Sequence, residues 1–373
     1  MSVFGRIQDG WRRFRNQLMG RVGFQTFATA FPLTRPIARR RSRQLFDLIA
    51  GFTYSQTLVA CVELGLIERL SRSPASLDEL ARAFGFAEHR LERLLKAAVS
   101  LKILERTSRG HYDLGIHGAA LIGNPWIAGF IKHHQLLYRD LADPISVVRG
   151  GEGLTALQSY WAYTADHHGQ ETDAKDVSAY TDLMGQSQAA VAREILSAYD
   201  FSAHRHLLDI GGSNGSFILA AAQRHKALAF TLFDLPAVSQ IARERILSAR
   251  LDGRVAVVEG SFLTDPLPDS ADVATLIRVL HDHDDESVAK IMGAAFRALK
   301  PDGVLIVAEP FSGIPSIEPV TDAYFGLYFA AMGQGKTRTT AEIIAIGQKI
   351  GFRSARVVAT QNPLITGILV LRI

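Results

Sequence analysis

The sequence has few of the features that mark a secreted or membrane-spanning protein. It contains one cysteine, Cys61, among 373 residues, which excludes an intrachain disulfide and fits a reducing compartment. It shows no secretory signal pattern and no uncharged apolar run of about 18 residues. Hydrophobic residues make up 47% of the chain, enough for a large core. We therefore expect two domains in a cytoplasmic protein that is soluble or peripheral to the inner membrane.

Acidic residues are almost absent from residues 1–43, here called the basic arm. Asp9 is its single acid against ten arginines, a net charge of +9, while the whole chain carries +4 and the remainder therefore −5. The arginines stand at positions 6, 12, 13, 15, 21, 35, 39, 40, 41 and 43, among the aromatic residues Phe4, Trp11, Phe14, Phe24, Phe27 and Phe31. Arginine with interleaved aromatics suits an anionic bilayer surface. A contact with a partner subunit and a contact with nucleic acid are the alternatives.

Residues 44–125 show a pattern of helices with a short hairpin. Ser76, three residues before Glu79, predicts a capping box at a helix start. A second helix over 87–101 and a β-wing over 103–114 follow. This shape can bind DNA, but nine basic and nine acidic residues leave no net charge for phosphate binding. We expect a mainly helical, winged-helix-like dimerisation domain that does not bind nucleic acid.

The rest of the chain predicts a second domain of alternating strands and helices. We predict that residues 126–200 form a helical connection that contributes to a substrate pocket, and that residues 201–373 form the SAM-binding catalytic domain. Strands are expected near 206–211, 229–234, 255–260, 273–279, 303–309, 353–360 and 364–372. Only Gln361, Asn362 and Pro363 join the last two, which is too short for a parallel crossover. The pattern predicts an α/β fold, a Rossmann-like, mostly parallel sheet with an antiparallel terminal hairpin, as in the methyltransferase variant.

A glycine turn follows the first of these strands. The strand ends in Asp209 and breaks into Gly211, Gly212 and Gly215 before a helix. Glycine lets backbone amides approach a ligand closely, and the helix start adds N–H donors. Asp234, at the end of the second strand, is placed to accept a ribose hydroxyl pair. The spacing departs from G-x-G-x-x-G, so the turn favours S-adenosyl-L-methionine over a dinucleotide, with a simple packing turn as the alternative.

Further cofactor contacts are expected where the neighbouring strands end. Ser261 and Phe262 follow the third strand, where a hydroxyl and an aromatic edge suit adenine and a surface turn is the alternative. Leu235 and Arg278 complete the predicted cofactor set.

Titratable residues follow the fourth and fifth strands. His281 and Asp282 come after the fourth strand and Glu309 ends the fifth. Ligands in open α/β sheets lie beyond the carboxyl ends of strands. A neutral imidazole can accept a proton, which is worth about 10²–10⁴-fold in rate, and Glu309 could orient the ring. We predict these three residues as catalytic, with no metal; a metal site and an acidic turn that caps the next helix are the alternatives.

An aromatic stripe at helical spacing follows the fifth strand. Such a stripe usually belongs to a core, but its place near Glu309 suggests an apolar substrate pocket. The predicted lining residues are Met184, Tyr324, Tyr328, Phe329 and Met332. Two other patterns predict no site: Gly335-Lys336-Thr337 lacks the earlier glycine and the strand of a phosphate loop, and the pair His167-His168 reads as solvated.

From about residue 45 to the end, the chain resembles S-adenosylmethionine-dependent O-methyltransferases of the caffeate and acetylserotonin type. The motifs are Leu-Leu-Asp-Ile-Gly-Gly-Ser-Asn-Gly (207–215), Phe-Asp-Leu-Pro (233–236), Leu-His-Asp-His-Asp-Asp-Glu (280–286) and Val-Ala-Glu-Pro (307–310). The resemblance implies a homodimer, cofactor contacts at Gly211 and Asp234, His281 as general base and Glu309 as its flanking acid. Residues 31–41 and 45–56 are similar to bacterial carotenoid O-methyltransferases, which implies methylation of the tertiary hydroxyl of an acyclic carotenoid.

The chain also departs from this family's pattern. Ser261 stands where an aspartate is usual, His283 where many members have tryptophan, and Thr337 where a second acid flanks the base. The rival interpretations are a methyltransferase for phenolic or polyketide-type substrates, a nicotinamide oxidoreductase, and a winged-helix regulator that senses an adenosyl ligand without catalysis.

Overall fold

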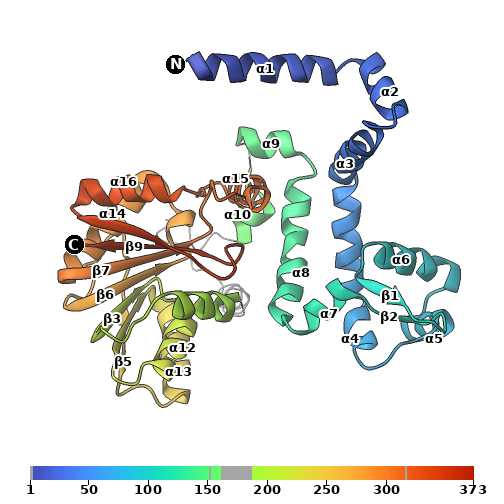
Figure 1. The fold of residues 1–373 in the computed structure, drawn as a ribbon. Helices are drawn as coiled ribbons and strands as arrows, with labels where there is room; N and C mark the ends of the chain where they lie inside the picture. Colours follow the sequence, from blue (N-terminus) through green and yellow to red (C-terminus); the bar gives the residue numbers. More distant parts are fainter. Residues whose placement is uncertain (1–2, 151–152, 161–186, 316) are drawn as a thin grey trace. The chain divides into compact units, whose positions relative to one another are not determined.

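The computed structural model describes residues 3–150, 153–160, 187–315 and 317–373 (Figure 1). Its contacts divide the chain into two compact units, Met1–Asn124 and Pro125–Ile373, and each is described separately. The predicted lining residue Met184 and the pair His167-His168 lie outside the described residues.

The first unit begins with three helices. These are α1 (Val3–Met19), α2 (Val22–Ala30) and α3 (Arg35–Glu63), which starts at a proline in its first turn and runs without a break across the expected boundary at 43/44. The unit continues with α4 (Leu66–Leu70), α5 (Leu77–Phe84), α6 (Glu88–Ser100), β1 (Leu104–Arg106), β2 (Tyr112–Leu114) and α7 (Ile116–Ile122).

The predicted capping box and β-wing are both present in the first unit. The Glu79 amide donates to the Ser76 hydroxyl at 3.2 Å, and the Ser76 amide donates to Glu79 Oε2 at 2.7 Å. Strands β1 and β2 pair antiparallel. Leu80, Leu95 and Tyr112 are fully buried, so the helices and the hairpin share one core.

Among the described residues, α3 is long and apolar enough to cross a membrane, judged by length and composition alone. The expectation of no uncharged apolar run of about 18 residues still holds for this helix, because Asp47 and Glu63 interrupt it. The carboxyl end of α3 is part of the core of the first unit, where Cys61 and Val62 are buried.

The second unit is built on a seven-stranded sheet in the order β5-β4-β3-β6-β7-β9-β8. Strands β3 to β7 are parallel, β9 pairs antiparallel with β7, and β8 pairs antiparallel with β9. The strands are β3 (His206–Ile210), β4 (Ala229–Asp234), β5 (Val255–Glu259), β6 (Ala271–Ile277), β7 (Leu299–Glu309), β8 (Ser354–Val358) and β9 (Gly367–Arg372). The predicted parallel sheet with a terminal antiparallel hairpin is therefore confirmed.

Helices cover both faces of this sheet. On one face lie residues 187–198, α12 (Ser216–Arg224) and α13 (Pro236–Ser248); on the other lie α14 (Asp285–Ala298) and α16 (Thr340–Ile350). Alternate residues of β7 enter opposite cores: Ile306 packs on the first face and Val307 on the second. The remaining helices are α8 (Pro125–Asp140), α9 (Pro144–Arg149), α10 (Ala156–Tyr160), the 3₁₀ turn η1 (Leu280–Asp282), the π-helix η2 (Pro319–Tyr324) and α15 (Phe325–Met332).

Several predicted strand limits were wrong by a few residues. Strand β6 ends at Ile277 rather than 279 because Arg278 adopts φ 56°, which extended backbone does not allow. Strand β7 begins at Leu299, four residues early. The link between β8 and β9 spans residues 359–366, so the expected three-residue connection was too short, although the hairpin forms.

Candidate active site

The carboxyl ends of the five parallel strands meet at one edge of the sheet (Figure 1). The register places Asp209 beside Leu232, and Ile277 beside Ala308. Segments that follow these strands therefore approach one another, although they come from distant parts of the sequence. All predicted cofactor and catalytic residues lie at or just beyond these strand ends.

The glycine turn after β3 needs glycine at two positions. Gly211 has φ 71°, and a Cβ there would lie 2.8 Å from the Val279 side chain and 3.6 Å from the Phe262 ring. A Cβ at Gly212 would lie 2.8 Å from Asp209 Oδ2. A larger side chain at either position would displace these neighbours, so glycine lets the turn pack closely against β3 and the loops after β5 and β6.

Two carboxyl groups frame this turn, Asp209 buried and Asp234 partly exposed. Asp209 Oδ1 accepts from the Thr275 hydroxyl at 2.6 Å, while Oδ2 is buried without a hydrogen-bond partner among the described residues. Burial raises the pKa of Asp209 to about 7. Asp234 accepts from the amides of Ser213 and Leu235, both at 2.7 Å, and burial raises its pKa to about 6. Asp234 thus ties the glycine turn to the end of β4.

The other predicted cofactor residues lie nearby but make contacts of their own. The Ser261 hydroxyl accepts from the Leu263 amide at 3.3 Å, so it helps to close its own turn. The Phe262 ring meets His283 edge-on at 5.4 Å. Leu235 is 38% exposed, and Arg278 donates to the Ser187 hydroxyl at 2.9 Å. Their contacts with adenine and ribose remain predictions.

The catalytic candidate His281 is held by Glu309, which is 4% exposed. Glu309 Oε1 accepts from the amides of Val279, at 2.9 Å, and Leu280, at 2.7 Å, while Oε2 accepts from His281 Nδ1. One carboxylate therefore fixes both the backbone before the histidine and the orientation of its ring. The predicted placement of Glu309 beside His281 is confirmed.

The other ring nitrogen of His281 faces Asp282. Asp282 Oδ1 lies 3.2 Å from His281 Nε2. Burial alone would lower the pKa of His281, but the carboxylates of Asp282 and Glu309 outweigh burial and raise it. Burial also raises the pKa of Asp282. Asp282 thus stabilises a proton on Nε2 and, by the same interaction, raises the pH at which the neutral base becomes available.

A clamp formed by residues 335–338 holds the loop that carries His281. The buried side chain of Arg338 donates to the carbonyls of Leu280, at 2.8 Å, and His283, at 2.7 Å, and pairs with Asp285. A Cβ at Gly335 would lie 2.4 Å from the His281 carbonyl oxygen, so this position also needs glycine. Sequence analysis considered this segment only as a phosphate loop and a missing acid, and it missed this role.

The predicted aromatic stripe contacts His281 on one side and His133 of α8 on another. Phe329 packs on His281 with ring centroids 5.4 Å apart, and Met332 is buried in the same cluster. The Tyr328 hydroxyl hydrogen-bonds His133 Nε2 at 2.7 Å. Most of these side chains thus belong to a hydrophobic core, and Phe329 also packs against the proposed base.

Helix α8 contributes a second pair that sequence analysis missed. His134 Nε2 hydrogen-bonds the Tyr324 hydroxyl at 2.8 Å, next to the His133 and Tyr328 pair. Burial lowers the pKa of His133 to about 4 and also lowers the pKa of His134, so both rings are neutral at physiological pH. Two adjacent histidines in a largely apolar helix were the available signal.

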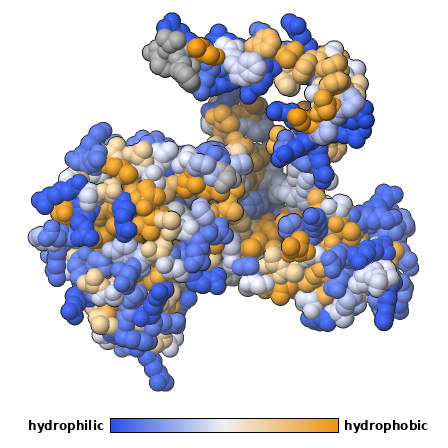
Figure 2. Space-filling view, viewed as in Figure 1, coloured by the Kyte–Doolittle hydropathy of each residue, from blue (hydrophilic) through white to orange (hydrophobic). Residues whose placement is uncertain are grey.

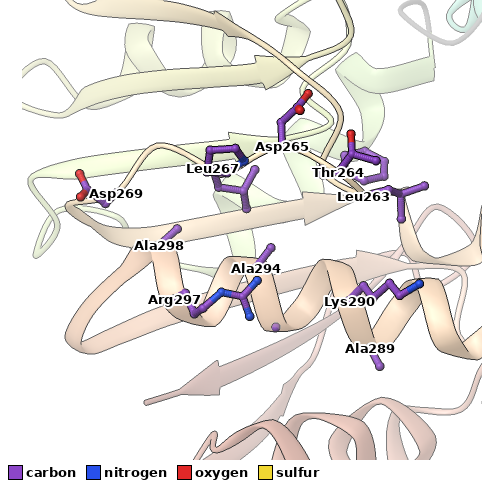
Figure 3. A pocket seen from close by; sticks show the side chains of 13 residues that line it. Leu263, Thr264, Asp265, Leu267, Asp269, Ala289, Lys290, Ala294, Arg297 and Ala298 are labelled. Atoms are coloured by element: carbon purple, nitrogen blue, oxygen red, sulfur yellow. The ribbon is translucent and has the colours of Figure 1, made fainter.

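A groove of about 500 Å³ lies beside the site, between α14 and the loop 262–269 (Figure 3). Phe262 is its only lining residue among the predicted site residues; Asp265 and Asp269 come from the loop, and Lys290 and Arg297 from the helix.

No group of three or more His, Cys, Asp or Glu side chains among the described residues is arranged to hold a metal ion.

The arrangement at the sheet edge fits an adenosyl ligand. The partly exposed carboxylate of Asp234 ends β4 beside the glycine turn, and Gly211 and Gly215 turn the chain from β3 into α12 at positive φ. A mixed seven-stranded sheet with this edge, joined to a helical unit, is the architecture of S-adenosylmethionine-dependent methyltransferases. Human N-acetylserotonin methyltransferase in complex with S-adenosylmethionine has this fold, with TM-score 0.72, 24% identity and coverage of 89% of this chain and 97% of that chain.

Sequence comparison assigns the family. The profile of the O-methyltransferase domain matches residues 138–353 and that of the O-methyltransferase dimerisation domain matches residues 46–119. The chain belongs to the O-methyltransferase family and is an S-adenosylmethionine-dependent enzyme of that family.

Two curated relatives are both demethylspheroidene O-methyltransferases. The chain is 38% identical to demethylspheroidene O-methyltransferase of Cereibacter sphaeroides over 356 residues, covering 95% of this chain and 93% of the relative. It is 37% identical to the protein of the same name in Rhodobacter capsulatus, covering 91% of this chain and 84% of the relative. CalO1, a methyltransferase in calicheamicin biosynthesis solved with S-adenosylhomocysteine, aligns with TM-score 0.73 and 26% identity over 89% of this chain and 98% of that chain.

The first prediction concerns the pH dependence of the base. Asp282→Asn removes a carboxylate that favours the imidazolium, so the pKa of His281 falls and the rising limb of kcat/KM against pH moves to lower pH. Methyl transfer from labelled cofactor across the neutral range measures the limb. Asp284→Asn, which alters only the cap of α14, is the control and leaves the limb in place. An unmoved limb in Asp282→Asn would show that this carboxylate does not tune the base.

The second prediction concerns the clamp. Arg338→Met leaves the carbonyls of Leu280 and His283 without their donor, so the free energy of unfolding falls on the order of 3 kcal/mol and kcat falls as the loop loosens. Denaturant unfolding provides the measurement. Lys336→Met breaks only a solvent-exposed pair with Asp285 and costs less than about 1 kcal/mol. Equal losses in the two variants would contradict the clamp.

Proposed function

We propose that the chain methylates a hydroxyl of an apolar small molecule, the candidate substrate being an acyclic carotenoid with a tertiary hydroxyl. The support is twofold: two relatives with 37–38% identity are demethylspheroidene O-methyltransferases, and the base lies against the aromatic side chain of Phe329. The single observation that carries the reaction type is the His281–Glu309 pair at the sheet edge. Phenolic and polyketide-type substrates are the alternative, since more distant relatives act on a naphthoate and in mitomycin biosynthesis.

In this proposal the residues after β3, β4 and β5 hold S-adenosyl-L-methionine. Gly211, Gly212 and Gly215 give the ligand access to backbone amides, and Asp234 accepts from the ribose hydroxyls. Asp209, Leu235, Ser261, Phe262 and Arg278 complete the contact set. When bound, the cofactor supplies a methyl group on a positively charged sulfur.

His281 removes the proton of the substrate hydroxyl. Glu309 accepts from Nδ1, so Nε2 is the nitrogen that can receive a proton, and Asp282 stabilises the imidazolium that results. A tertiary alcohol is far less acidic than an imidazolium, so His281 would take the proton only as the alcohol oxygen bonds to the methyl carbon and the bond from that carbon to sulfur breaks. Positioning then supplies much of the rate, and well-oriented groups contribute about 7–11 kcal/mol.

The aromatic stripe forms the substrate wall in this proposal. Phe329 borders the base, and Tyr324, Tyr328 and Met332 line the more distant part. Neutral histidines on α8 hydrogen-bond the two tyrosines, so these phenols keep a fixed orientation.

The proposed assembly and location follow from the same features. The chain contains a dimerisation domain, and we place the enzyme as a homodimer through it. A long apolar substrate dissolves in lipid, so the proposed location is the cytoplasm at the face of the inner membrane, with the basic arm as the contacting surface.

The third prediction tests the base and the substrate class together. His281→Ala lowers turnover about 10²–10⁴-fold while the cofactor Kd, measured by calorimetry, stays unchanged. Labelled methyl transfer to hydroxylated acyclic carotenoids and to phenols, with products identified by mass, measures turnover. His117→Ala, which alters an exposed histidine of the first unit, is the control and leaves turnover unchanged. Full turnover in His281→Ala would contradict the base, and methylation of phenols alone would contradict the carotenoid assignment.

A further inference from the structure

Helix α1 presents one apolar stripe to solvent. Ile7, Trp11, Phe14 and Leu18 follow a spacing of four, three and four, which places them on one side of a helix. Ile7, Trp11 and Phe14 are 66%, 65% and 54% exposed. Large apolar side chains gathered in this way on a surface mark a binding face rather than scattered exposure.

Positive charge flanks this stripe with almost no acid to balance it. Arg6, Arg12, Arg13 and Arg15 lie on the same helix, and Asp9 is the one acid of α1. Among the described residues only Arg12, of these four, lies within 4 Å of an acid, at 3.8 Å from Asp9, and its side chain is 63% exposed. Figure 2 shows hydrophobic and hydrophilic residues side by side along this part of the chain.

We propose that α1 lies in the plane of an anionic lipid bilayer. The side chains of Ile7, Trp11 and Phe14 enter the boundary between headgroups and acyl chains, and the arginines pair with lipid phosphates. A basic helix with an aromatic apolar face binds interfaces in this way, because apolar burial and attraction to anionic lipid act on the same segment. The inference names the lipid class that the basic arm contacts, and in that respect it rests on the proposed function.

A second copy of the chain fits this face less well than lipid does. Symmetric dimers bring the same patch of both partners together, and two copies of α1 would place eight arginines against one another. The dimerisation domain matches residues 46–119 and begins after the arm. Contact with a partner through that domain would cover the exposed apolar side chains of Phe46, Ile49 and Phe52 on α3. Helix α1 lies outside the domain and needs another partner.

Vesicle flotation of the full chain tests the proposal. Vesicles of phosphatidylglycerol with phosphatidylcholine are compared with phosphatidylcholine alone, at about 0.1 M and about 0.5 M salt. The chain binds the anionic vesicles, and binding weakens with salt. Substituting glutamine at Arg6, Arg12, Arg13 and Arg15 lowers the partition coefficient at least about tenfold.

A matched control removes the same charge elsewhere in the first unit. Glutamine at Arg72, Arg90, Arg93 and Arg109, all exposed, leaves the partition coefficient within about twofold of the unchanged chain. A second variant, Trp11→Ser with Phe14→Ser, keeps the charge and loses the binding that remains at high salt. Cofactor affinity, measured by calorimetry without vesicles, stays the same in every variant, so failure of membrane docking is distinguishable from failure of the proposed enzyme function.

Four results would overturn the proposal, and a fifth, given last, also contradicts it. These are equal binding to neutral and anionic vesicles, equal loss in the matched control, dissociation of a dimer in the α1 variants by sedimentation, and capture by duplex DNA in place of vesicles. A chain that stays in the membrane at high salt in both α1 variants would instead indicate that α3 spans it, which also contradicts docking through α1.

Discussion

One buried carboxylate, Glu309, determines the geometry on which the chemistry depends. It accepts hydrogen bonds from two backbone amides and from His281 Nδ1. These bonds hold the turn after β6 against the end of β7. A buried charge is stable only when it is fully hydrogen-bonded, and these three donors meet that condition. The same bonds leave Nε2 as the one ring nitrogen available for proton transfer, with Asp282 beside it.

Two different segments support the base. Residues 335–338 hold the backbone of the loop that carries it, through Gly335 and Arg338. The second carboxylate near the imidazole comes from Asp282, which follows it directly in the chain. Charge on the base and rigidity of its loop are thus supplied by different segments.

Sequence reasoning predicted what depends on strand order and missed what depends on long-range contacts. The terminal hairpin was predicted correctly, although the link is longer than the three residues expected, and the meeting of His281 with Glu309 followed from parallel strands ending at one edge. The contact of His133 with Tyr328 joins residues 195 positions apart, and no local pattern records it. The early end of β6 depends on the positive φ of Arg278, which its residue type does not reveal.

The state of the His281 ring tests the account most directly. Nitrogen chemical shifts of histidine-labelled protein, followed against pH, report both the pKa of the ring and the nitrogen that keeps its proton. The account predicts a pKa above the ordinary value of about 6.5 and a neutral form protonated at Nδ1, toward Glu309. A pKa at or below that value, or a neutral form protonated at Nε2, would contradict it.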